Sequence, residues 1–446
     1  MAFPFTVDSL LDGTTVYHAG HVLGPQRITV GPTMFNAKSD LYNGGAKGDG
    51  VANDAPAIQA ALDAAALVGG GIVGIPHGSY LCAAKLRLTS DNVILRGSGW
   101  NTVIKAANGL NDDLISTPTT ALAVRNYVGV ENLAIDGNKA NQSAGSALRL
   151  YGLRYGFVDR VFIHDAFNQC LMLDSDPGAI GYQNVYSRIV TDVSGGAVYE
   201  NGHEGCVFRD NVWKWCDGNY MFRCEKGAHK IYANIFGGGG TYTVPALHLR
   251  NNLASQVMFN RFDSPRRAGI QIDASNNIVC FNEVQDASAS GSALAPAIST
   301  GGGVQNCIVV GNRVYAFSTV KYSYAYQENG SNNIVKLNQF DVGVSGRISL
   351  PSAVNFVGDN PGYNPLGHAI TQPAVPATAT PLTNNSGVDA AVFITPGAST
   401  CAVSIGGSAT GVTLASGGIG QMFRVPAGQT VTLTYTSAPT WQWFGD

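Results

Sequence analysis

Residues 231–262 read IYANIFGGGGTYTVPALHLRNNLASQVMFNRF, and this stretch decides the fold. Asn234 stands two residues before Phe236, and the same pair returns 26 residues later as Asn260 and Phe262. Two further short apolar runs, ALHLR and VMFN, lie between the pairs. Three short strands that are joined by Asn-rich and Gly-rich turns, with a repeat of about 26 residues, are typical of one coil of a parallel β-solenoid.

The same motif, a small polar residue followed two positions later by an apolar one, recurs along the chain. Its members are Glu131–Leu133, Asp159–Val161, Ser187–Ile189, Asn211–Trp213, Asn234–Phe236, Asn260–Phe262, Asn282–Val284, Asn312–Val314 and Asn338–Phe340. Asparagines at one bend of successive coils can form an amide ladder, and asparagine tolerates the left-handed backbone of such bends. The repeat therefore predicts an all-β protein, a parallel β-helix of about 10–12 coils.

Composition agrees with this fold class and excludes others. Glycine contributes 55 of 446 residues and charged residues only 13%, whereas apolar residues reach 45%. Such values exclude intrinsic disorder and coiled coils. The net charge is −3 and Lys and Arg form no block, which argues against a nucleic-acid partner. No apolar run is long enough for a transmembrane helix, so we expect no membrane insertion.

The cysteines and the N-terminal residues give information about the cellular compartment of the protein. None of the eight cysteines forms a CxxC pair, and several lie in apolar runs, so we expect free buried thiols. The opening MAFPFTVDSLLDGTT lacks the basic and apolar regions of a classical signal peptide.

The segments that flank the repeat predict four parts. We expect an attachment segment at 1–38, the β-helix domain at 39–358, a Pro/Ala/Thr-rich linker at 359–381 and a small β-sandwich at 382–446. Within the second part, residues 55–68 predict an amphipathic helix that begins near Pro56 and stops at Gly69-Gly70-Gly71. A solenoid end exposes apolar backbone, and this helix is well placed to cap it.

Residues 44–65 (GGAKGDGVANDAPAIQAALDAA) and 69–80 (GGGIVGIPHGSY) resemble the opening of the pectate-lyase-like superfamily of right-handed parallel β-helices. This superfamily includes pectin-degrading enzymes, alginate epimerases and bacteriophage tailspike depolymerases. Residues 7–22 and the segment from residue 380 to the end look like the flanks of phage tail proteins. The resemblance implies a homotrimer that binds and cuts a surface glycan. It places the protein on a virion tail or outside the cell without a classical signal peptide, and in the cytoplasm before release.

Strand alternation predicts which side chains of the second strands face outward. The inward positions are Leu171, Val198, Met221, Leu247 and Ile270, and the outward set is Met172, Asp174, Tyr199, Asn201, Phe222, Cys224, His248, Arg250, Gln271 and Asp273. Carboxylates on coils spaced ~4.8 Å apart match the separations that glycoside hydrolases use. The candidate catalytic carboxylates are Asp174, Asp176, Glu200, Glu204, Asp217, Glu225 and Asp273.

The candidate substrate-binding residues are Tyr199, His203, Trp215, Arg223, His248, Arg250 and Gln271. Glu200 and Arg223 fall near the same register, where a structural ion pair is the alternative, and Trp213 is expected in the core. No DxDxDG loop appears, so no metal and no cofactor is predicted.

The leading hypothesis is an endo-acting glycoside hydrolase on a phage or prophage tail that acts on a polysaccharide. A polysaccharide lyase, with Tyr199 and His248 as base and acid, is one alternative, and an intramolecular transglycosylase is another. A non-catalytic glycan-binding tail protein is a competing class. The tail-like flanks disfavour an intracellular epimerase.

Overall fold

The computed structural model describes residues 34–445, apart from 251–253, 292, 318, 351–354, 361–371 and 387–388. Residues 1–33 of the predicted attachment segment and most of the predicted linker therefore lie outside the described residues. The chain divides into two compact units at Gly269 and Ile270, and each unit is described by itself.

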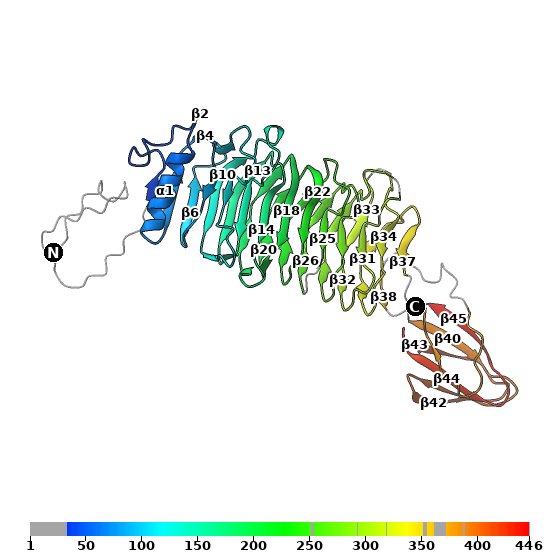
Figure 1. The fold of residues 1–446 in the computed structure, drawn as a ribbon. Coiled ribbons are helices and arrows are strands. Elements are labelled where there is room, and N and C mark those ends of the chain that lie inside the picture. Colours follow the sequence, from blue (N-terminus) through cyan, green and yellow to red (C-terminus); the bar gives the residue numbers. More distant parts are fainter. Residues whose placement is uncertain are drawn as a thin grey trace, which may run out of the picture. The chain divides into compact units, whose positions relative to one another are not determined.

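The first unit is a stack of parallel strands, which fall into three series that run along the stack (Figure 1). The first series is β1 (Met34–Asn36), β3 (Gly71–Ile75), β6 (Val93–Gly97), β10 (Gly129–Asp136), β13 (Phe157–His164), β16 (Val185–Ser187), β20 (Val207–Arg209), β23 (Lys230–Tyr232) and β26 (Gln256–Met258). The second is β2 (Asp49–Asn53), β4 (Gly78–Cys82), β7 (Thr102–Ala106), the ends of β10 and β13, β17 (Val190–Asp192), β21 (Val212–Trp213), β24 (Ile235–Gly237) and β27 (Arg261–Asp263).

The third series forms the face that concerns function. It runs β5 (Leu86–Arg87), β8 (Ile115–Ser116), β11 (Leu148–Tyr151), β14 (Gln169–Asp174), β18 (Ser194–Asn201), β22 (Cys216–Cys224) and β25 (Leu247–Leu249). A smaller four-stranded sheet follows it on four of the coils, with β9 (Arg125–Asn126), β12 (Leu153–Arg154), β15 (Gly181–Tyr182) and β19 (His203–Glu204). All these pairings are parallel, as the repeat predicts.

Helix α1 (Ala55–Leu67) lies at the start of the first unit and confirms the predicted helix (Figure 1). Pro56 occupies its first turn, and the buried side chains Ile58 and Leu62 pack toward β3. Gly70 follows the helix with φ +131°, and a Cβ there would lie 2.5 Å from Cβ of Asn92, so only glycine fits this turn.

The second unit contains coils of the same three-strand kind. Its strands up to residue 358 are β28 (Ile270–Ile272), β29 (Ile278–Cys280), β30 (Glu283–Gln285), β31 (Ile298–Thr300), β32 (Ile308–Val310), β33 (Arg313–Tyr315), β34 (Tyr324–Gln327), β35 (Ile334–Lys336), β36 (Gln339–Phe340), β37 (Gly346–Ser349) and β38 (Phe356–Gly358). Pairing among these strands is again parallel.

Residues 382–445 form two small antiparallel sheets instead of coils. One holds β39 (Leu382–Thr383), β44 (Thr430–Tyr435), β41 (Cys401–Ile405) and β42 (Ser408–Leu414), and the other holds β43 (Gln421–Val425), β40 (Ala390–Thr395) and β45 (Thr440–Gly445). Val392, Val403, Leu433 and Trp443 share one buried core between them. That these two sheets form a sandwich domain remains a prediction.

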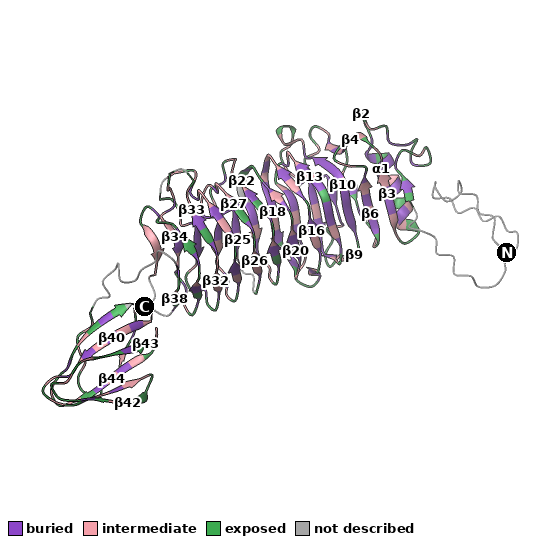
Figure 2. Ribbon diagram, turned by 180° about the vertical axis from the view of Figure 1, so that it is seen from behind, coloured by how far each residue is buried: buried purple, intermediate pink, exposed green. Residues whose placement is uncertain are grey.

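The asparagine ladder is present within each unit. Asn211 donates its amide to Oδ1 of Asn234 at 2.8 Å, and Asn234 does the same to Asn260 at 2.9 Å. Asn282, Asn312, Asn338 and Asn360 repeat this arrangement in the second unit. Buried residues alternate with less buried ones along the strands (Figure 2), so each coil has an apolar interior.

The predicted start of the ladder was wrong by two residues. Ile189, and not Ser187, precedes Asn211 in the column, because its backbone N–H donates to Oδ1 of Asn211 at 2.9 Å. Leu133 and Val161 occupy the same position on earlier coils, as the strand registers show. The coil that ends at Asn211 is shorter, because Ile189 and Asn211 are 22 residues apart whereas Leu133 and Val161 are 28 apart, and the register of the motif shifts there.

All eight cysteines are free and buried, which confirms the prediction. Among the described residues, no helix is long and apolar enough to cross a membrane.

Candidate functional site

Two rows of outward side chains cross the β5–β25 face of the first unit. The Tyr199 row holds Arg149, Met172, Tyr199, Arg223 and His248, which pair strand by strand. The Glu225 row lies two residues further along each strand and holds Tyr151, Asp174, Asn201, Glu225 and Arg250.

The predicted orientation of β22 was wrong by one residue. Phe222 pairs with Val198 and Leu247 and is buried, whereas Arg223 pairs with Tyr199 and faces outward. Cys224 is also buried, although alternation from Met221 placed it outside. The register of β22 shifts between its pairings with Ser194 and Gly196, where extra residues are accommodated, and this shift moves every later side chain of the strand.

The Tyr199 row brings a phenol, a guanidinium and an imidazole onto three neighbouring strands. The guanidinium of Arg223 lies 5.4 Å from the centroid of the Tyr199 ring. Adjacent strands are ~4.8 Å apart, so a single sugar residue can span Tyr199 and Arg223 or Arg223 and His248. All three side chains are half-buried, which leaves them accessible from the surface.

Arginines hold both carboxylates of the Glu225 row. Asp174 accepts from Arg149, whose Nη2 lies 2.5 Å from Oδ2, and Arg149 also approaches Asp113 at 3.5 Å. Glu225 forms an ion pair with Arg223, and Nη1 of Arg250 lies 3.8 Å from its Oε1. Arg149, Arg223 and Arg250 therefore all pair with carboxylates on this face.

Arg149 and Asp113 were not among the predicted site residues. The run ALRLY at 147–151 carries the same alternation as LMLD at 171–174, so extending the alignment by one strand would have placed Arg149 beside Met172. Asp113 lies in a loop before β8, where alternation gives no information.

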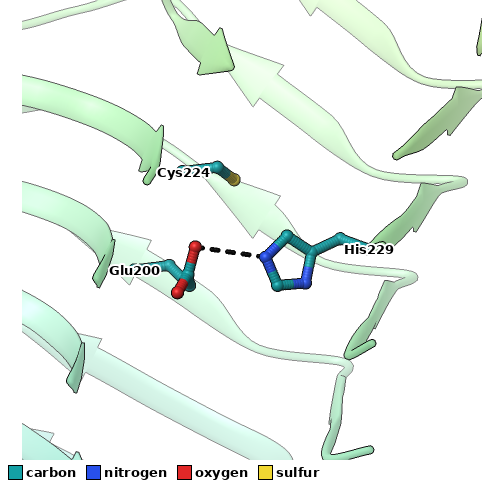
Figure 3. A group of neighbouring side chains, drawn as sticks. All are labelled: Glu200, Cys224 and His229. Atoms are coloured by element: carbon teal, nitrogen blue, oxygen red, sulfur yellow. Dashed lines mark hydrogen bonds and ion pairs between the residues drawn. The ribbon is translucent and has the colours of Figure 1, made fainter. Parts of the chain in front are cut away.

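Glu200 lies inside the solenoid, fully buried, and not on the surface (Figure 3). Its Oε1 accepts the backbone N–H of Gly202 and of His203 at 2.8 Å each. Its Oε2 accepts the N–H of Lys226 at 2.9 Å and lies 3.1 Å from Nε2 of His229. A glycan on the surface would not reach this carboxylate, and its partner is His229 instead of Arg223.

The charges of this buried pair support each other. Burial alone would raise the pKa of Glu200, but the charge and hydrogen bond of His229, with the backbone donors, lower it below its usual value. Burial alone would lower the pKa of His229, but the Glu200 carboxylate raises it to about 10. We conclude that the pair is a buried salt bridge.

Among the described residues, two groups of side chains could hold a metal ion. Ligand atoms of Glu200, Cys224 and His229 lie within 4.8 Å of one another (Figure 3), and this donor set is of the kind that binds zinc. An ion there would have to displace the proton that His229 shares with Glu200. Asp136, His164 and Asp165 form the second group, in which Lys105 already pairs with Asp136 at 2.8 Å.

His203 is also buried, which argues against its predicted role in substrate binding. Its Nδ1 lies 2.9 Å from the hydroxyl of Tyr186 and 3.3 Å from Nδ2 of Asn184. Burial opposes ionisation of the neighbouring Cys206 thiol, yet hydrogen bonds from His203 and His229 lower its pKa to about 7.

The remaining predicted residues are dispersed. Asp176 accepts the N–H of Leu122 at 2.7 Å, and the exposed Asp217 pairs with Lys139 at 3.0 Å. Trp215 is exposed and covers Gly239. Glu204 is exposed on β19, outside both rows. In the second unit, Nε2 of Gln271 donates to Asp273 at 2.9 Å.

These features define a parallel β-helix protein with a face that carries several arginines together with Tyr199, His248 and the carboxylates of Asp174 and Glu225. Residues 41–169 match the family model described as rhamnogalacturonase A/epimerase, pectate lyase-like. Alginate lyase 7 of Azotobacter vinelandii is 33% identical over 211 residues, which cover 42% of this chain and 23% of that protein. Mannuronan C5-epimerase AlgE1 of the same organism is 38% identical over 120 residues, 25% of this chain and 8% of that protein. The chain thus spans less than a quarter of the length of these relatives.

Solved structures share the fold. The A-module of the Azotobacter vinelandii epimerase AlgE4 aligns with a TM-score of 0.58 at 20% identity, over 72% of this chain and 99% of that chain. The tailspike protein gp49 of Acinetobacter baumannii bacteriophage Fri1, a capsular polysaccharide depolymerase, aligns with a TM-score of 0.51 at 12% identity, over 92% of this chain and 85% of that chain. The resemblance to pectate-lyase-like β-helices and tailspikes is therefore confirmed, and these structural likenesses establish the fold alone.

Proposed function

We propose that the chain is a polysaccharide-modifying enzyme that abstracts the C5 proton of a uronic-acid residue, with elimination or epimerisation as the outcome. The observation that carries this proposal is the Tyr199 row, in which Tyr199, Arg223 and His248 stand on consecutive strands. The relatives that are named for alginate cleavage and mannuronan epimerisation support it.

Abstraction of the C5 proton requires a cation beside the carboxylate of the sugar as well as a base. A proton next to a carboxylate becomes acidic only when the negative charge that develops on the carboxylate is stabilised, and a guanidinium does this with two hydrogen bonds. Arg223 is central in the row and supplies that cation. Tyr199 and His248 flank it on either side, so one removes the proton while the other donates a proton to the leaving oxygen or to the opposite face of the sugar.

Hydrolysis is the second candidate. Asp174 and Glu225 lie in one row, two strands apart, so their backbones are separated by roughly 9–10 Å. That separation is close to the range of inverting glycosidases. Each of the two carboxylates is already engaged by an arginine, whereas a glycosidase needs its carboxyl groups directed at the glycosidic oxygen and at a water molecule, so the geometry favours proton abstraction.

We further infer that the protein acts as a homotrimer on a phage or prophage tail, where it degrades a host surface glycan. The tailspike proteins among the structural neighbours support this inference. A binder without turnover is the remaining alternative.

The test is a panel of uronic-acid and neutral polysaccharides, with absorbance at 235 nm and reducing ends followed together. The proposal expects products from a uronan and their loss in Arg223→Met. If the wild-type products lack an unsaturated sugar, and Asp174→Asn and Glu225→Gln each abolish turnover, hydrolysis is the correct assignment. Binding without any product from any glycan would identify a binder.

A further inference from the structure

One bend of each coil passes through a residue with left-handed backbone. In the first unit these residues are Asn92, Tyr127, Tyr155, Gln183, Gly205, Ala228 and Ala254, and a bend of the same kind in the second unit has Asn276, Asn306 and Asn332. The same kind of hydrogen bond to the next coil is made by the N–H groups of Asn92, Tyr127, Tyr155, Gln183, Gly205 and Asn276, for example from Tyr127 to the carbonyl of Arg154 at 2.9 Å. Asparagine and glycine are the residues that this conformation favours. A bulky tyrosine at two successive bends is therefore a departure from the local preference.

The two tyrosines are also exposed. Tyr127 is 54% exposed and Tyr155 is 41% exposed, so burial of their rings does not explain their presence. Their rings stack with centroids 5.5 Å apart and planes 19° apart. Tyr182, on the next coil, meets Tyr155 edge to face at 5.1 Å, and the two hydroxyls are 3.3 Å apart. Three tyrosines thus follow one another along three coils.

A cavity of about 510 Å³ adjoins the last of these tyrosines. Its walls include Tyr182, Arg154 and Glu204, with Pro177 and Gly178 from the neighbouring turn. The guanidinium of Arg154 lies 4.8 Å from the centroid of the Tyr182 ring, and its Nε donates to the carbonyl of Ile180 at 3.0 Å, so it is fixed in place. Among the described residues the Glu204 carboxylate has no hydrogen-bond or ion-pair partner.

Aromatic rings beside fixed polar groups match the chemistry of a sugar chain. Aromatic side chains offer large apolar area with a polar tip, and Glu204 and Arg154 offer an acceptor and donors for hydroxyl groups. The coils that carry Arg149, Met172 and Tyr199 also carry Tyr155, Tyr182 and Glu204, and only Gly202 separates β18 from β19. Tyr127 lies one coil earlier, directly after β9.

We propose that Tyr127, Tyr155 and Tyr182, with the cavity of Arg154 and Glu204, form a second glycan-binding subsite. It binds a part of the polymer that is remote from the reacting residues. This inference rests on the proposed function, because it takes the polymer to be the substrate. A short oligosaccharide would fill the Tyr199 row alone, whereas a polymer would also occupy the tyrosines.

The test compares Tyr127→Asn/Tyr155→Asn with the wild-type chain on polymeric alginate and on alginate trisaccharides. Asparagine is the residue that Asn92 supplies at the same bend, so the backbone conformation is kept. Phe259→Asn is the matched control, because Phe259 is 61% exposed and has φ 56° at a different bend of the same unit. Binding is measured by retardation in gels that contain alginate, and turnover by KM and kcat.

The inference expects the double variant to bind polymeric alginate at least fivefold more weakly. Its KM should rise by the same factor, while kcat and turnover of the trisaccharide stay unchanged. Phe259→Asn should match the wild type in every measurement. An equal loss on trisaccharide and polymer would indicate a structural effect and overturn the inference.

The outcomes separate this inference from the proposed function. If the wild type turns over alginate and the double variant keeps its KM, the subsite is wrong and the enzyme assignment stands. If the wild type binds alginate through the tyrosines without forming product, the subsite stands and the assignment fails. No retardation of the wild type overturns the subsite. Loss of self-association in the double variant would make this surface a subunit interface and also overturn it.

Discussion

Truncation of one member of the asparagine ladder should destabilise the fold by an amount that follows from its hydrogen bonds. We choose Asn234→Ala in the first unit. The Asn234 side chain accepts the backbone N–H of Asn211 at 3.1 Å and donates to the carbonyl of Phe208 at 3.0 Å. It also links the amides of Asn211 and Asn260. All of these groups are shielded from water inside the coil.

The magnitude depends on which groups keep a partner. The Asn211 amide retains the carbonyl of Tyr186, and Oδ1 of Asn260 retains the backbone N–H of Asn234. The backbone N–H of Asn211 loses its partner, which costs about 1–3 kcal/mol for a buried group, and the lost amide bonds add about 1 kcal/mol. We therefore expect the free energy of unfolding to fall by about 3 kcal/mol.

Urea unfolding followed by tryptophan fluorescence measures this loss. Trp213 is a suitable probe, because it is buried two residues beyond Asn211. Asn306→Gly serves as the control, since Asn306 is exposed at a left-handed bend where glycine is tolerated, and it should change stability by less than about 0.5 kcal/mol. A loss below about 0.5 kcal/mol for Asn234→Ala would refute the claim that the ladder holds the coils together.

Three further outcomes are expected. NMR should show that the imidazole of His229 keeps its proton up to about pH 10, because the Glu200 carboxylate faces it, and that Glu200→Gln loses this proton below pH 6.5. The contribution of this proton to the free energy of unfolding is complete below about pH 6.5 and is lost as the pH rises through 10. A wild-type His229 that is neutral at pH 8 would contradict the buried salt bridge. Arg149→Met should lower the free energy of unfolding by about 3–5 kcal/mol by leaving Asp174 unpaired, and Asp174→Asn in that background should restore most of it; an unchanged urea midpoint for the single variant would refute this. Sedimentation should give about three times 46.6 kDa, and a monomer would contradict the trimer.

The pattern of polar and apolar residues in the sequence was sufficient to predict the three-strand coil. It was insufficient to predict the strand register at every coil. Asn234 and Asn260 mark a bend that a strand count can find, because the amide ladder requires the same residue type on each coil. Ile189 occupies the same column without an amide, so no residue type identifies it. In β22 the inserted residues near Cys216 turn Arg223 outward, and such a shift is visible only from pairing with the neighbouring strand.

In the candidate site, too, strand alternation predicts some residues, whereas other contacts arise only when the coils stack. Tyr199 and His248 follow from alternation and were predicted as a pair. Glu200 is one residue beyond Tyr199 and so must face inward, yet a charged side chain in an apolar interior is costly without a partner. That partner, His229, lies 29 residues away and approaches Glu200 only because the coils stack. The pairing of Asp174 with Arg149 likewise depends on a contact between coils, whereas Arg223 and Glu225 are only two residues apart in the sequence.

Proton abstraction by the Tyr199 row is the central claim, and incubation with mannuronan in D₂O tests it most directly. Products are followed by proton NMR and by absorbance at 235 nm, in the wild type and in Tyr199→Phe. The account predicts deuterium at C5 or an unsaturated sugar in the wild type, and neither in Tyr199→Phe. New reducing ends without deuterium and without an unsaturated sugar, retained in Tyr199→Phe, would contradict it.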